Sequence, residues 1–463
     1  SLPRSRRCAL HRQVAGALAA AVHCGTAAQP ERLAHHYCEA GDFAAAIDAW
    51  QRAAALAINR GALGEAAWHY RSALGLVTSI PESPQRADTE IGLWLGLAQV
   101  SLPLNGWAST EVSEAYTRAL TLSEQLGDET RRHLVLLGLT ISRMTRGDLQ
   151  AARKLARETL ATGKRLGFST GRVWGHFALG AVYLFSAELE PARRHTQAAI
   201  RLYRGADFEG SPADPGISGR SYAALTEWHL GNADAARRLS QEAIELAASI
   251  RKPHATAFAY QFAGVLYILL REPQRVWELA DRLGEVATEL QFPMYRAMAF
   301  LQRGWALARL GYVEEGLPQL RDGLERYVAT GQRLGLGWYL ALLAEAEAAS
   351  GRAGDALATL TSALTDTPRK DIAQPYLLWL RAELALQTDG SASHIELADA
   401  WYRRALESAT ELRMPPYQLR IATRRVRWRC SAEARQELAT IAASIREGFD
   451  TRDWQDAQAA LGK

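Results

Sequence analysis

A unit of two short amphipathic helices recurs along this 463-residue chain, and this repetition restricts the fold more than any other feature of the sequence. Its clearest copy runs from Arg172 to Tyr203. In the first half Gly180 stands between Phe177 and Tyr183 at helical spacing, and in the second half Ala192 is a further small position. Two helices approach closely only where side chains are small, and neighbouring rings fill the space beside the contact. The pattern predicts antiparallel helix pairs packed through Gly and Ala.

Helix-stop signals give the period of this unit. Each signal is a residue pair that ends one helix and begins the next, because glycine adopts the left-handed stop conformation and Asp or Asn accepts from free amides. The stops recur about every 40 residues, which is longer than the minimal tetratricopeptide of about 34 residues and predicts extended helices or longer joins. The sequence therefore predicts an all-α fold, an α-solenoid that winds as a right-handed superhelix of tandem tetratricopeptide-like helical hairpins. The pairs are Gly147–Asp148, Ala187–Glu188, Gly231–Asn232, Arg271–Glu272, Gly311–Tyr312 and Gly351–Arg352.

Proline-rich and flexible stretches divide the chain into three expected parts. Residues 1–84 are predicted to be an opening helical segment with the first, irregular repeats. Residues 85–386 form the regular array, and residues 394–463 form the last repeats and a capping helix.

One loop, at residues 204–216, is longer than the repeat requires. Its Asp214-Pro215-Gly216 is a strong turn signal. Asp207, Phe208 and Asp214 make this loop a candidate lid over a binding groove, and a simple turn is the alternative. Its length predicts that it is among the more mobile parts of the chain.

The first helices of successive units are expected to line the concave side of the superhelix. Register is taken from the small positions Gly180, Ala224, Gly264, Gly304 and Ala344. It assigns twelve side chains to that groove, most of them aromatic. We expect them to bind an apolar or aromatic small molecule, or a partner helix, with the polar members fixing orientation. Several Lys, Arg and Asn would favour an acidic peptide tail, and this set lacks them. The alternative is that the rings pack between repeats in a tightly wound superhelix with little open groove. The twelve are Trp174, Phe177, Phe185, Trp228, His229, Phe258, Gln261, Phe262, Trp305, Arg309, Trp338 and Glu345.

Sequence patterns for catalysis and cofactor binding are incomplete. Thr162-Gly163-Lys164 lacks the upstream glycine of a phosphate-binding loop, and Gly335-Leu336-Gly337 lacks the third glycine of a dinucleotide fingerprint. We therefore expect no catalytic residues, no cofactor site and no enzyme activity in this chain. A metal could be imagined at His23, Cys24, His35, His36 and Cys38, but adjacent His35 and His36 point about 100° apart on a helix. Ordinary helix packing is the expected role of this group.

The densest basic run holds five arginines near the end of the chain. Spacings of three and four place Arg420, Arg424 and Arg427 on one helix face. A solvated outer face is the expected state. A domain contact and binding of phosphates are the alternatives. The remaining members are Arg425 and Arg429.

Composition limits the class of protein further. Hydrophobic residues make up 48% of the chain and charged residues 22%, as in ordered globular proteins. No run reaches the roughly 18 apolar residues of a membrane helix, so no membrane association is expected. A net charge of +4, spread over many helices, does not favour direct nucleic-acid binding. Cys8, Cys24, Cys38 and Cys430 lack disulfide or metal spacing, which predicts free thiols and a cytoplasmic location.

Several stretches, taken in order, resemble one known region. They are ERLAHHYCEAGDFAAAIDAWQRAAALA (Glu31 to Ala57), EVSEAYTRALTLSEQLGD (Glu111 to Asp128), the DPG of the long loop, RGWALARLG (Arg303 to Gly311), LALLAEA (Leu340 to Ala346) and REGFDTRDWQDAQAAL (Arg446 to Leu461). Together they are similar to the C-terminal tetratricopeptide region of bacterial STAND-type signal-transduction ATPases. In that family the ATPase module is attached to adenylate cyclase-like or winged-helix DNA-binding domains.

The resemblance implies a sensor or regulatory domain. A ligand or partner held in the superhelix would change its contact with the ATPase module. ATP and Mg²⁺ are implied only for that module, which this chain lacks. The expected partners are the chain's own upstream ATPase module or another protein, and a small-molecule effector. A scaffold that binds a partner helix or peptide, without a small ligand, is the alternative. Because the chain begins with Ser1, we expect it to be a fragment of a longer protein.

Overall fold

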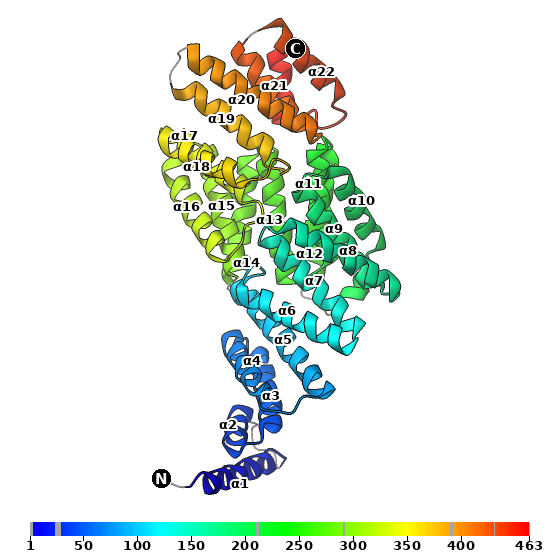
Figure 1. Ribbon diagram of the computed structural model, residues 1–463. Helices are drawn as coiled ribbons and strands as arrows, with labels where there is room; N and C mark the ends of the chain where they lie inside the picture. Colours follow the sequence, from blue (N-terminus) through cyan, green and yellow to red (C-terminus); the bar gives the residue numbers. More distant parts are fainter. Residues whose placement is uncertain are drawn as a thin grey trace. The chain divides into compact units, whose positions relative to one another are not determined.

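The computed structural model describes residues 3–23, 29–209, 213–289, 292–388, 392–429 and 431–462. The described residues form 23 α-helices, one short 3-10 helix and no strand (Figure 1). The chain divides into two compact units, residues 1–142 and 143–463. Because this division reflects contacts and not repeat regularity, the three-part division expected from the sequence stays a prediction.

The first unit holds six helices and most of a seventh. One buried cluster joins its first five helices through Ala15, Leu33, Ile47, Ala73 and Leu93, one residue from each helix. The helices are α1 (Arg4–His23), α2 (Pro30–Ala40), α3 (Phe43–Asn59), α4 (Leu63–Val77), α5 (Pro84–Asn105), α6 (Thr110–Leu126) and α7 (Glu129–Thr145), which crosses the boundary.

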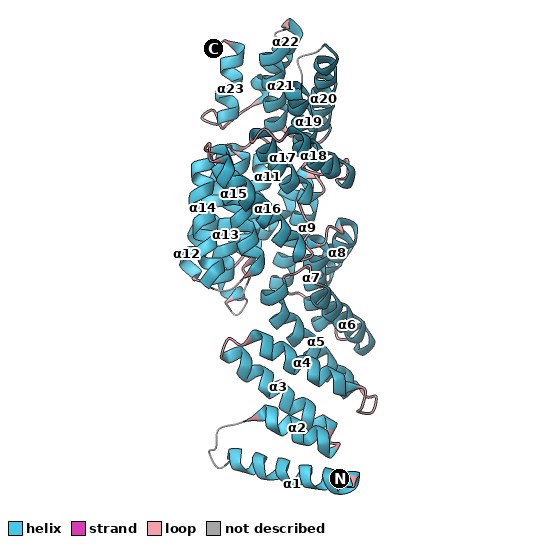
Figure 2. Ribbon diagram, turned by 90° about the vertical axis from the view of Figure 1, so that its left-hand side faces the viewer, coloured by secondary structure: helices cyan, strands magenta, loops and turns pink. Residues whose placement is uncertain are grey.

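The second unit is a series of antiparallel hairpins joined by short loops (Figure 2). The first helices of successive hairpins, α9 through α21, contact one another and so form one side of the array. This confirms the predicted α-solenoid of tetratricopeptide-like hairpins. The elements are α8 (Leu149–Arg165), α9 (Ser169–Phe185), α10 (Leu189–Leu202), η1 (Gly205–Phe208), α11 (Pro215–His229), α12 (Ala233–Ile250), α13 (Pro253–Leu269), α14 (Pro273–Glu289), α15 (Pro293–Arg309), α16 (Val313–Ala329), α17 (Leu336–Ala349), α18 (Ala353–Asp366), α19 (Gln374–Thr388), α20 (Ala392–Glu411), α21 (Pro415–Arg429), α22 (Ala432–Ser444) and α23 (Arg452–Leu461).

The predicted helix stops coincide with the turns inside these hairpins. Gly231 and Gly311 have φ angles of 90° and 97°, in the left-handed region that glycine tolerates. Ala187 and Arg271 adopt the same region, with φ of 55° and 63°, although they carry a Cβ. The turn geometry is thus kept even where the sequence does not supply glycine.

Small residues set the distance between paired helices, most clearly in the hairpin of α15 and α16. A Cβ added at Gly304 would lie 2.6 Å from the backbone nitrogen of Leu320, and one added at Gly316 would lie 2.5 Å from the carbonyl oxygen of Gly304. The two backbones are therefore in direct contact, as the small positions predicted.

The end of the second unit returns to contact helices near its beginning, where α21 packs against α11. We call the contacts of Arg420 and residues 447–456 with residues 233–237 and 269–271 the C-terminal clasp. In it Arg237 pairs with Asp450 at 2.8 Å, and Arg271 pairs with Asp453 at 2.9 Å although 182 residues separate the latter two. The backbone amide of Gly448 donates to Asp234 at 3.2 Å. The clasp therefore connects α21, α23 and the loop before α23 with the start of α12 and the end of α13.

No helix in the described part of the chain combines the length and the apolar character needed to cross a membrane.

Replacement of Gly304 by Ala should destabilise the second unit by about 1–3 kcal/mol, because the new methyl group meets backbone that cannot move independently. Gly354→Ala is the control, since a Cβ there has no neighbour within 4 Å. This control should be neutral or stabilising by up to about 1 kcal/mol. Urea unfolding followed by circular dichroism measures both, and equal effects would contradict the close contact.

Candidate functional site

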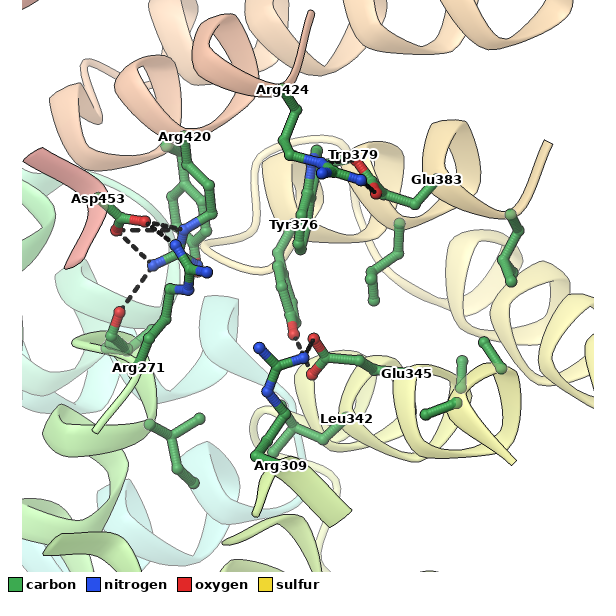
Figure 3. Close-up of a pocket in the computed structure, with 18 of the residues that line it drawn as sticks. Arg271, Arg309, Leu342, Glu345, Tyr376, Trp379, Glu383, Arg420, Arg424 and Asp453 are labelled. Atoms are coloured by element: carbon green, nitrogen blue, oxygen red, sulfur yellow. Dashed lines mark hydrogen bonds and ion pairs between the residues drawn. The ribbon is translucent and has the colours of Figure 1, made fainter. Parts of the chain in front are cut away.

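A cavity of about 310 Å³ lies on the inner side of the second unit, between helices α13, α15, α17, α19, α21 and α23. Figure 3 shows Arg271 and Arg420 at one side of it, Arg309 with Glu345 at another, and Arg424 with Glu383 at a third, with Tyr376 between them. Part of the space exists because α17 presents small side chains, those of Ala344, Ala348 and Ala349. Successive first helices thus each contribute one wall.

Glu345 is the centre of one wall. Its carboxylate accepts hydrogen bonds from Trp305 Nε1 at 3.1 Å and from the Tyr376 hydroxyl at 3.0 Å. Arg309 Nη1 donates to its other oxygen at 3.2 Å. Burial, followed by the charge of Glu345, raises the pKa of Tyr376 well above its ordinary value, so its hydroxyl stays protonated and donates.

Aromatic rings form the apolar part of the lining. Tyr376 and Trp379 stack with ring centroids 5.4 Å apart, and Tyr417 lies 6.2 Å from Tyr376. Trp305 and Trp338 complete the set. The indole Nε1 of Trp379 is buried and has no hydrogen-bond partner among the described residues. The cavity therefore offers flat apolar faces beside charged groups, a combination suited to binding amphipathic ligands.

Helix α21 supplies a second charged wall, and here the structure corrects the sequence prediction. Arg420 and Arg425 are 6% and 9% exposed, so the basic run is not a solvated outer face. Arg420 pairs with Asp453 at 2.7 Å and donates to the carbonyl of Leu269 at 2.8 Å. All five arginines have carboxylate partners: Asp453 for Arg420, Glu383 for Arg424, Asp399 and Glu437 for Arg425, Asp456 for Arg427, and Asp399 for Arg429. The run serves contacts within the unit.

Four of the twelve predicted groove residues line this cavity: Trp305, Arg309, Trp338 and Glu345. Five others gather around Tyr222, a residue that the sequence analysis did not single out. Tyr222 lies 4.8 Å from Phe262 and 5.6 Å from Phe177, measured between ring centroids. The other rings of this cluster are Trp174, Phe185 and Phe258. Here the rings pack against one another, which is the arrangement that the alternative prediction described.

The last three predicted groove residues are buried. Trp228 packs against Tyr417 at 5.4 Å, and His229 Nδ1 donates to the carbonyl of Leu225 at 2.7 Å. Burial lowers the pKa of His229 to about 4, so this histidine is neutral near pH 7. The backbone carbonyl of Gln261 accepts from Gln302 Nε2 at 2.8 Å. None of the three lines the cavity.

The described residues of the loop at 204–216 do not line the cavity either. Phe208 is 3% exposed and stacks on Tyr203. Asp214 caps α11 through the amides of Gly216 and Ile217 and accepts from the Tyr203 hydroxyl at 2.9 Å. Asp207 accepts from Ser169 at 3.2 Å. These anchors hold both ends of the loop, and residues 210–212 lie outside the described part.

Several cavity residues escaped the sequence analysis. Arg271 lies in the turn between α13 and α14, and the groove prediction considered only residues on first helices. Tyr376, Trp379 and Glu383 belong to α19, for which no small position was used to set the register. Repetition of the register by one more unit would have placed α19 next to α17. Asp453 had no such signal, because its role depends on the C-terminal clasp.

Among the described side chains, no group of three or more His, Cys, Asp or Glu is arranged to hold a metal ion. Of the group considered in the sequence, the side chains of His23 and Cys24 are not described. His36 contacts His11 of α1, with the two Nδ1 atoms 2.9 Å apart, and Cys38 is a free thiol.

No protein-family model and no curated protein matches the chain. Among solved structures, the Rap protein complexed with competence and sporulation factor aligns with a TM-score of 0.51 and 12% identity, over 80% of this chain and 98% of that chain. The human IFIT1 dimer with m7Gppp-AAAA aligns with a TM-score of 0.44 and 12% identity, over 90% of each chain. The Rap conjugation gene regulator of the plasmid pLS20, in complex with the Phr* peptide, aligns with a TM-score of 0.43 and 15% identity, over 62% and 77%. The likeness to the first Rap protein shows the fold, a tetratricopeptide-like helical repeat.

Asp453→Asn should lower the free energy of unfolding of the second unit by roughly 3–5 kcal/mol, because it leaves the buried Arg420 guanidinium without its carboxylate. Asp322→Asn is the matched control. Asp322 pairs with Arg326 on the surface, where the side chains are 41% and 49% exposed, and its loss should cost under about 1 kcal/mol. Urea unfolding compares the two, and similar losses would contradict a structural role for the clasp.

The C-terminal clasp should weaken in acid. Hydrogen bonding by Arg237 lowers the pKa of Asp450. At Asp456 burial alone raises the pKa, but hydrogen bonds from Arg271 and Arg427 outweigh it and leave the pKa below its ordinary value. Because both folded-state pKa values are lowered, their stabilisation is present above the unfolded value of about 3.9 and is lost as the pH falls below it.

The distance between spin labels on Gln241 of α12 and Ala459 of α23, in a cysteine-free background, measures this opening. It should stay constant between about pH 5 and 8 and lengthen below about pH 4. A label pair on Gln241 and Ser249, both within α12, should not change. A constant distance for the first pair down to about pH 1, where carboxylates are protonated, would show that these carboxylates do not hold the clasp.

Proposed function

We propose that this chain is a regulatory binding module that takes a segment of a peptide or partner protein into the cavity of its second unit. One observation carries the proposal. The cavity combines five aromatic rings with charged side chains from successive first helices, whereas the rings around Tyr222 pack against one another. A volume of about 310 Å³ suits a few side chains of a polypeptide. The fold supports this role, since the Rap protein with the same fold was solved in complex with competence and sporulation factor.

We infer that the module acts by binding and not by catalysis. The carboxylates that line the cavity are held by arginines, as with Glu345 by Arg309 and Glu383 by Arg424. A general base must be able to take a proton from a substrate, and ion pairs of this kind oppose that. Carboxylates and arginines that are held in ion pairs are better suited to binding a ligand than to proton transfer.

The resemblance of the chain to STAND-type regions supports a sensory role, in which the bound ligand controls an ATPase module elsewhere in the protein. Such control requires a ligand whose affinity differs between two states of the module. The clasp provides a candidate pair of states, closed and open, because Arg271, Arg420 and Asp453 belong both to the clasp and to the cavity. In the full-length protein, ligand binding is expected to change the rate of ATP hydrolysis.

A free small molecule is the second candidate ligand. The cavity volume lies at the lower end of the range for small-molecule pockets, about 300–1,000 Å³. Native mass spectrometry of the purified protein distinguishes the candidates, since a small molecule held in the cavity adds a discrete mass.

Ala348→Phe should abolish peptide binding by filling the cavity, whereas the chain remains folded. Ala358→Phe, at an exposed position of α18, is the control and should bind as the wild type does. Peptides selected from a displayed random library on the wild-type protein are measured by calorimetry against all three proteins. The expected loss is at least about tenfold in affinity, or 1.4 kcal/mol. Selected peptides that bind Ala348→Phe unchanged would place the binding site elsewhere and overturn the proposal.

A further inference from the structure

Every carboxylate that lines the cavity is already paired with an arginine. Four carboxylates line the cavity, and both oxygens of each already accept from arginine, tyrosine or tryptophan among the described residues. They are Glu345, Glu383, Asp453 and Asp456. A cationic ligand would therefore compete with an arginine for each of these carboxylates.

Some of the arginine N–H donors, in contrast, have no partner among the described residues. A guanidinium carries five N–H groups. Within the described structure Arg309 uses only Nη1, toward Glu345, and Arg271 uses only Nη1, toward Asp453 and Asp456. Both arginines line the cavity, and neither is fully buried, since the side chain of Arg309 is 39% exposed and that of Arg271 is 27% exposed. The buried Trp379 Nε1 adds a donor without a described partner.

The net charge of the cavity lining also favours an anionic ligand. Five arginines and four carboxylates line the cavity, which leaves an excess of one positive charge. Apolar rings line the cavity between these charged groups, and low-dielectric surroundings strengthen the field of a charge. A negative group would therefore meet both unused donors and a favourable potential.

We propose that the ligand of this cavity carries a carboxylate or a similar anionic group, received by Arg271 and Arg309, next to an apolar or aromatic part that lies on Tyr376 and Trp379. This inference rests on the proposed binding function and names its ligand class. An acidic side chain, a peptide C-terminus and a free organic acid share this chemistry.

Two fluorescent probes that differ by one anionic group test it. 8-Anilinonaphthalene-1-sulfonate and N-phenyl-1-naphthylamine have the same rings, but only the former carries a negative charge. The sulfonate probe should bind at least roughly tenfold more tightly. Arg309→Gln should remove most of this difference, and Arg309→Lys should restore part of it. Arg326→Gln, in an ion pair outside the cavity, is the matched control and should change neither affinity.

Displacement of the sulfonate probe then identifies the carboxylate and its source. N-acetyltryptophan, which ends in a carboxylate, should displace it at roughly tenfold lower concentration than N-acetyltryptophanamide, which is neutral. An N-acetylated, C-terminally amidated peptide with internal Asp tests the side-chain source. Displacement by this peptide alone assigns the anion to a side chain, and displacement by N-acetyltryptophan alone assigns it to a chain terminus or free acid.

The outcomes separate this inference from the proposed function. Equal affinities for the two probes, both lost in Ala348→Phe, would leave a cavity that binds neutral aromatic ligands and overturn the anionic class alone. Sulfonate binding that is unchanged in both Arg309→Gln and Ala348→Phe would show adsorption elsewhere and would also overturn the inference. Circular dichroism and thermal midpoints confirm that each variant is folded.

Discussion

The burial of one guanidinium organises the C-terminal half of this protein. Arg420 is 6% exposed, and a charge removed from water in this way is costly unless it is paired and hydrogen-bonded. Asp453 of α23 accepts from its Nε and Nη2, and the carbonyl of Leu269 at the end of α13 also accepts from Nη2. Helices distant in the sequence are thereby brought together. The same residues belong to the C-terminal clasp and to one wall of the cavity.

Side-chain size decides where the inner side of the solenoid is filled and where it is open. Around Tyr222, helices α9, α11 and α13 present large rings that contact one another and leave the space occupied. Toward the end of the chain, α17 presents Ala344 and Ala348 instead, and the larger side chains of α19 and α21 surround the remaining volume. One repeat geometry thus yields a packed core in one region and a cavity in the next. Some of the charged residues of the cavity, such as Arg271 and Asp453, also belong to the clasp.

The repeat register places some predicted residues in the cavity and others, such as Phe262, in the packed cluster around Tyr222. The small positions Gly180, Gly264 and Gly304 lie at close helix contacts, so the assignment of first helices was sound. Trp305 and Glu345 line the cavity, but Phe177 and Phe262, at comparable positions, pack around Tyr222. Periodicity states which side of a helix faces inward. It does not state how much room remains there, because that depends on the side chains of helices that are distant in the sequence.

The sequence by itself determined the all-α hairpin architecture, since helix stops and small packing positions are local signals that depend on neighbouring residues only. It also identified the basic run of α21 as unusual. Only the tertiary structure decided the role of that run, because its partners, such as Asp453 and Glu383, lie 33 and 41 residues away from Arg420 and Arg424. The pairing of Arg271 with Asp453 spans 182 residues. Contacts of this kind arise from the curvature of the superhelix, which accumulates over many repeats and has no signature in any one of them.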